Sequence, residues 1–167
     1  MLGETEKEAV EKGIKTLWLI WAVGMLGLFA YLSIIYTLGE EITPTGKDLP
    51  LELLGNIFYG VSVIVLYLGH FIRTRITKDT SFSAQLFKNK TQLNQPLFLA
   101  KYNMAVVVSW AMAESVAIFG LVLFFIGADY QTFYILLAIS ALAMVFFRPK
   151  RAELEELASA DQPKPAF

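Results

Sequence analysis

Four long apolar runs, separated by polar segments, dominate the pattern along this chain. Each run is close to the roughly 20 residues that a helix needs to cross a bilayer. The runs are apolar all round and do not alternate apolar with polar positions, which argues against the strands of a membrane barrel. The pattern therefore predicts an all-α polytopic membrane protein with four transmembrane helices, at residues 17–38, 53–72, 98–126 and 131–147.

Polar segments define the remaining organisation. Residues 1–15 mix charge signs at helical spacing, which predicts a short amphipathic lead-in on the cytoplasmic side of a membrane domain at 16–149. The connection at 73–97 is polar and basic, and a short amphipathic helix is expected within it around residues 82–87. The tail at 150–167 begins as a charged helix and ends in a proline-rich stretch that we expect to be disordered.

Composition agrees with this reading. The chain is 56% hydrophobic and only 17% charged, below the usual quarter of charged residues in soluble domains. A signal peptide is not favoured for the first run, because it is too long and no cleavage site follows it. There are no cysteines, so disulfides, thiol chemistry and Cys-ligated metals are excluded. The net charge of −1 says little about partners.

The distribution of basic residues predicts an orientation. Lysines and arginines gather in the N-terminal tail, in the 73–97 connection and in the final tail, whereas the other two connections contain only Lys47. By the positive-inside rule, both termini and the 73–97 connection are expected in the cytoplasm.

Glu114 is the one carboxylate placed well inside an apolar run. It lies 13 residues from Lys101 and 13 from Gly127, roughly 20 Å from either boundary at 1.5 Å per residue. An ionised carboxylate at that depth is costly, so we expect a protonated group hydrogen-bonded to a neighbouring helix. His70 is too far along the membrane normal to pair with it. Both a link between helices and a charge-transfer role remain open for Glu114 at this point.

The residues around Glu114 favour close helix packing. Small side chains let backbones approach one another, and they occur here at Ala111, Ala113, Ala117 and Gly120. The neighbouring Ser115 could offer an oxygen to a shared hydrogen bond or a bound ion.

The third run also resembles a known family. The stretch AESVAIFGLVLFF resembles the outer, ion-binding helix of the proteolipid (c or K) subunit of rotary ATP synthases and ATPases. The NQP sequence at Asn94, Gln95 and Pro96 resembles the polar loop of that subunit, 18 residues before the acid, and the resemblance covers about residues 94–126. The chain differs from the family in its additional helices and in the absence of a glycine-rich inner helix.

The resemblance implies a function. It makes Glu114 the H⁺- or Na⁺-binding carboxylate and Ser115 a possible ligand, while Asn94, Gln95 and Pro96 form the loop that faces the stalk. Val116 lacks the second hydroxyl that some Na⁺ sites use, which favours H⁺. It also implies a homo-oligomer, possible other membrane subunits that supply an arginine, and residence in a prokaryotic inner membrane, with no cofactor other than the ion.

The residues also allow a second class of function. A structural or assembly protein could keep the same helix for packing alone and move no ion. An enzyme is not expected, because the apolar runs hold only isolated polar residues and no pair of convergent catalytic groups. The sequence also has no phosphate loop or dinucleotide fingerprint, and we expect neither a metal site nor a nucleic-acid partner.

Overall fold

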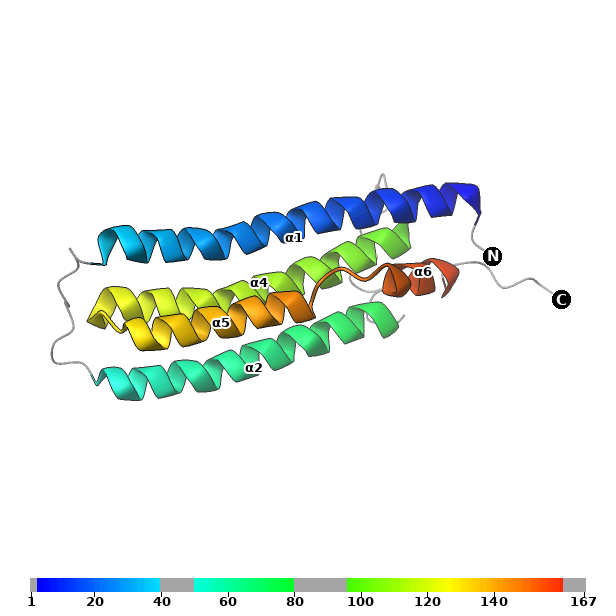
Figure 1. The fold of residues 1–167 in the computed structure, drawn as a ribbon. Coiled ribbons are helices and arrows are strands. Elements are labelled where there is room, and N and C mark those ends of the chain that lie inside the picture. The colour runs from blue at the N-terminus through cyan, green and yellow to red at the C-terminus, as the bar shows by residue number, and fades with distance from the viewer. Residues whose placement is uncertain (1–2, 40–49, 80–95, 161–167) are drawn as a thin grey trace.

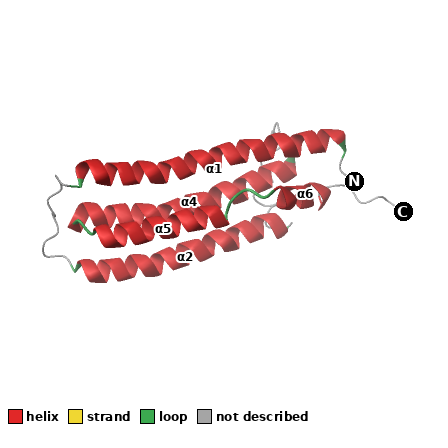
Figure 2. Ribbon diagram, in the orientation of Figure 1, coloured by secondary structure: helices red, strands yellow, loops and turns green. Residues whose placement is uncertain are grey.

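The computed structural model describes residues 3–39, 50–79 and 96–160. In those ranges the chain forms α-helices joined by loops, without a strand, as Figure 2 shows, so the all-α prediction is confirmed for this part of the chain. The helices are α1 (Glu4–Leu38), α2 (Leu51–Lys78), α4 (Leu97–Gly127), α5 (Tyr130–Phe146) and α6 (Arg151–Ala160).

The helix α4 is the centre of the bundle, because it packs against all four of the others. The helices α1 and α4 run in one direction and α2 and α5 in the other, while α6 lies beside the N-terminal part of α1 (Figure 1). The buried side chains of α4 lie on one broad face along its whole length, whereas Val107, Ile118 and Val122 on the opposite face are exposed. Glu114 lies halfway along α4, at the edge of this buried face and next to α1.

Three helices, α1, α2 and α4, are long and apolar enough to cross a membrane. The fourth expected span corresponds to α5, which has 17 residues. Together with α6, from which it is bent by 47°, α5 makes a possible fourth span. The described chain therefore has three or four candidate spans where the sequence predicted four.

The N-terminal lead-in and the first expected span form one helix. The helix α1 has 35 residues, about 52 Å at the usual rise per residue. Its first turn is closed by Glu6, whose Oε2 accepts a 2.9 Å hydrogen bond from the backbone N–H of Gly3. A helix of this length exceeds the roughly 30 Å of a hydrocarbon core, so one of its ends must project beyond that layer if it spans a bilayer.

The second helix ends later than the sequence predicted. The helix α2 does not stop at residue 72 but continues to Lys78, and it carries Arg73 into the bundle, where that side chain is buried. The amphipathic helix expected around residues 82–87, and the motif residues Asn94 and Gln95, lie outside the described residues. Pro96 directly precedes α4, and the charged helix expected in the tail corresponds to α6.

A short turn brings α4 and α5 into close contact. Ala128 adopts a left-handed conformation with φ 55° at the end of α4, and the Asp129 side chain accepts a 3.0 Å hydrogen bond from the Thr132 N–H at the start of α5. A Cβ atom at Gly120 would lie 3.1 Å from the Cα of Phe133 and 3.2 Å from its carbonyl oxygen. Glycine at this position is what allows the two backbones to approach so closely.

Candidate functional site

Glu114 lies in the middle of α4 and is half-buried. No ion pair involves its carboxylate in the described ranges, where the ion pairs that do occur sit toward helix ends. Its described polar neighbour is therefore a neutral group and not a cation.

A neighbouring helix supplies the hydrogen bond that the sequence predicted. The hydroxyl of Tyr31, in α1, donates to Oε1 of Glu114 across 2.9 Å. One turn before Tyr31, Gly27 also faces the carboxyl, since a Cβ atom there would lie 3.6 Å from the same oxygen. The carboxyl group thus lies against the backbone of α1 at Gly27, with Tyr31 beside it.

The second carboxyl oxygen of Glu114 is placed differently. Oε2 has no hydrogen bond within the described residues. In those residues the fully buried side-chain atoms without a hydrogen-bond partner are Asn103 Oδ1 and Ser140 Oγ, and Oε2 of Glu114 is not one of them. Oε2 therefore reaches the surface of the chain. Glu114 has one oxygen held by α1 and one oxygen available to lipid, water or a partner.

The other residues predicted near the site are only partly brought together. The Ser115 hydroxyl donates to the carbonyl of Met112 in its own helix across 2.7 Å, and no hydrogen bond joins Ser115 to Glu114. Among the small residues, Ala113, Ala117 and Gly120 are buried in helix contacts, whereas Ala111 is exposed. The described residues include no cluster of three or more His, Asp or Glu side chains that could hold a metal.

The position of Tyr31 follows from a heptad pattern in α1. The side of the helix that faces the bundle repeats at alternating steps of four and three residues, which is the a and d spacing of a coiled-coil seam. It comprises Val10, Ile14, Leu17, Trp21, Gly24, Leu28, Tyr31 and Ile35. Our sequence analysis missed Tyr31, and this pattern is the signal that would have found it.

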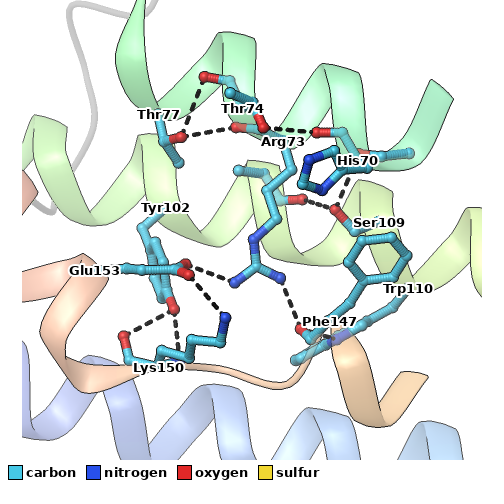
Figure 3. A network of polar contacts seen from close by, with 12 residues as sticks. His70, Arg73, Thr74, Thr77, Tyr102, Ser109, Trp110, Phe147, Lys150 and Glu153 are labelled. Carbon is cyan, nitrogen blue, oxygen red and sulfur yellow. Dashed lines mark hydrogen bonds and ion pairs between the residues drawn. The ribbon is translucent and has the colours of Figure 1, made fainter. Parts of the chain in front are cut away.

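A second polar network lies where α5 ends, and Figure 3 shows it. Pro149 has no N–H and helps to end α5, so nearby carbonyl groups lack helical donors. The carbonyl of Phe147 accepts a 2.8 Å hydrogen bond from Arg73 and a 3.0 Å hydrogen bond from the indole of Trp110. The carbonyl of Met144 accepts a 2.9 Å hydrogen bond from the Trp21 indole. Side chains from three helices therefore donate hydrogen bonds to the carbonyl groups at the end of α5.

The same network fixes α6. The phenol of Tyr102 accepts a 2.7 Å hydrogen bond from the N–H of Lys150 and donates a 3.0 Å bond to the carbonyl of the same residue (Figure 3). Glu153, in α6, lies 2.7 Å from the guanidinium of Arg73 and 3.3 Å from Nζ of Lys150. Two cations thus share one carboxylate, which leaves this cluster with a net positive charge. The sequence analysis had assigned Arg73 to a basic surface connection and did not anticipate the cluster.

Comparison with known proteins gives no relative for the chain. No family model, no curated protein and no solved structure matches it.

Proposed function

We propose that this chain is an integral membrane subunit of a homo-oligomer and that it carries a proton on Glu114, with Na⁺ as a less favoured ion. The environment of the carboxyl group supports this proposal best: Oε1 receives the hydrogen bond of Tyr31, and Oε2 reaches the surface of the chain. The apolar lengths of α1, α2 and α4 support the membrane location. The resemblance of residues 94–126 to rotary-ATPase proteolipids supports the choice of ion transport as the function.

The geometry suits a proton carrier because one carboxyl oxygen is bound to α1 while the other can carry and release the proton. Hydrocarbon strongly disfavours an ionised carboxylate, so the resting group is the neutral acid. A neutral carboxyl has one O–H donor and can still accept hydrogen bonds. With Tyr31 donating to Oε1, the acid proton belongs on Oε2, which has no hydrogen bond within the described residues. The proton can therefore pass to an approaching group while the link to α1 stays in place.

Release of that proton requires a positive charge from outside the described chain. One neutral hydroxyl cannot compensate an ionised carboxylate in an apolar medium. Arg73 is the buried arginine of the described bundle, and it is engaged by Glu153 and the Phe147 carbonyl. We therefore propose that a neighbouring membrane subunit presents an arginine to Oε2. In this arrangement the ends of α1 and α6 that lie together face the cytoplasm, as the positive-inside rule implies.

A structural role is the second candidate, and the Tyr31 hydrogen bond is the observation that favours it. A carboxyl that joins α1 to the central helix could serve assembly alone. The substitution Glu114→Gln separates the two functions, because the amide oxygen still accepts a bond from Tyr31 but the side chain has no proton to release.

The test is proton flux into liposomes that contain the purified oligomer and an internal pH-sensitive dye. The proposal expects Glu114→Gln to abolish flux while the mass of the oligomer is unchanged. Wild-type flux in this variant would show that Glu114 is not the carrier. Absence of flux in the wild type, with loss of the oligomer only in Glu114→Leu, would establish the structural role.

Carbodiimide labelling gives an independent test, because the reagent reacts with protonated carboxyls in apolar surroundings. We expect modification of Glu114 and not of Glu52, an exposed carboxylate at the start of α2. Protection of Glu114 by Na⁺ would move the assignment from H⁺ to Na⁺. Unmodified Glu114 would contradict the proposed neutral resting state.

A further inference from the structure

A groove separates α2 from α5 on the outside of the bundle. Both helices pack mainly against α4 and touch one another only slightly, so a furrow of about 550 Å³ remains between them. Its walls are almost entirely apolar, and they include Leu66, Tyr67, Ile139, Leu142 and Phe146. Tyr67, Leu142 and Phe146 are exposed, so nothing in the described chain covers the groove.

One end of the groove is basic. His70 forms part of the lining, and its ring centre lies 6.2 Å from that of Phe146. Nζ of Lys150 lies over the same phenylalanine ring, 5.9 Å from its centre. Glu153 pairs with Lys150 at 3.3 Å and with Arg73 at 2.7 Å, so one negative charge is shared between two cations. A positive charge therefore remains at the mouth of an apolar furrow.

We propose that this groove, lined by α2 and α5 and ending at His70 and Lys150, binds one phospholipid with an anionic headgroup. The apolar walls match an acyl chain, and the lining from Ile139 to Phe146 spans roughly 10 Å of helix at 1.5 Å per residue. The phosphate lies at Lys150, where the apolar walls end, with the His70 imidazole beside it as a hydrogen-bonding group. Basic groups at this level of a membrane protein attract anionic headgroups. The inference rests on the membrane location proposed above but not on proton transport.

The experiment uses the full-length protein in nanodiscs made of phosphatidylcholine with increasing phosphatidylglycerol, and it counts retained lipid by native mass spectrometry. Phosphatidylglycerol should be retained in preference to phosphatidylcholine. Lys150→Gln should weaken this retention by about fivefold, the size expected for one basic group near the surface. Lys15→Gln is the matched control, because it removes an exposed lysine of α1 and should leave retention unchanged.

A second variant tests the apolar part of the groove. Ala143 lies in the lining, and Ala143→Trp should fill the furrow and displace the lipid while Lys150 is intact. Three results would overturn the proposal. They are equal retention of both lipids, equal losses of retention in the two lysine variants, and full lipid retention in Ala143→Trp. A lower oligomer mass in Ala143→Trp than in the wild type would instead identify a neighbouring copy of the chain as the occupant.

These experiments can refute the proton-transport proposal and the lipid-binding proposal independently of one another. Glu114→Gln should keep wild-type lipid retention, so a lost flux with retained lipid concerns only the proton site. Lost lipid selectivity with normal flux would overturn the lipid site alone.

Discussion

The hydroxyl of Tyr31 and Oε1 of Glu114 lie 2.9 Å apart, although 83 residues separate them in the chain. The bond joins the first helix of the bundle to its centre at the level where the sequence places its only deep carboxylate. Together with the hydrogen bond from the Trp21 indole to the Met144 carbonyl, this contact restrains the rotation of α1 against the bundle.

Loss of the Tyr31 hydroxyl should weaken the bundle modestly. We expect Tyr31→Phe to lower the free energy of unfolding by about 0.6 kcal/mol, a typical value for a hydrogen bond between membrane helices. The measurement is loss of helical circular dichroism during titration of micelles with sodium dodecyl sulfate. Tyr36→Phe is the control, because Tyr36 is 88% exposed on the same helix. Equal stability of the two variants would show that the bond contributes nothing.

The close approach of α4 and α5 should be sensitive to a single methyl group. Gly120→Ala places a Cβ atom against the backbone of Phe133, and overpacking of this kind costs about 1–3 kcal/mol. Gly60→Ala is the matched control, since a Cβ atom there meets nothing within 4 Å. It should leave stability unchanged or raise it slightly, because alanine favours a helix more than glycine does. The same denaturant titration compares the two variants, and a neutral Gly120→Ala would refute the tight contact.

The Arg73–Glu153 pair should make stability depend on pH in the acid range. Burial by itself would raise the pKa of Glu153, but hydrogen bonds and charges from Arg73 and Lys150 outweigh it and lower the pKa. A carboxyl with a lowered pKa in the folded state contributes stability above its unfolded pKa. That contribution disappears as the pH falls through the folded pKa.

The pH prediction is checked by comparing wild type with Glu153→Gln between pH 7 and pH 3. The difference in unfolding free energy between the two should be largest near neutral pH and should shrink as the pH falls below about 4, the ordinary range of a glutamate. Glu156→Gln serves as control, because Glu156 is an exposed residue of the same helix. A difference that stays constant over this range would mean that the ion pair does not stabilise the fold.

Much of the local structure could be read from the chain. The apolar runs predicted both ends of α4 and α5 within one residue and the C-terminal end of α1, because the length and polarity of a run decide whether a helix can lie in an apolar medium. The start of α1 was placed 13 residues too late, because the charged lead-in at 1–15 continues into the apolar run as one helix. The helical character of the segment after residue 150 was also predicted. The end of α2 was placed too early, because the polar residues after 72 suggested a connection, whereas α6 and the end of α5 provide partners that bury Arg73.

The sequence by itself determined that Glu114 lies in the middle of an apolar helix, since position along a helix follows directly from residue number. Only the tertiary structure decided that Tyr31 meets this carboxyl, that Ser115 bonds to its own helix instead, and that Arg73 is engaged by Glu153. Helical periodicity defines the faces of each helix but not which faces meet. That choice depends on the fit of side chains between helices, here on the heptad seam of α1 and the glycine contact between α4 and α5.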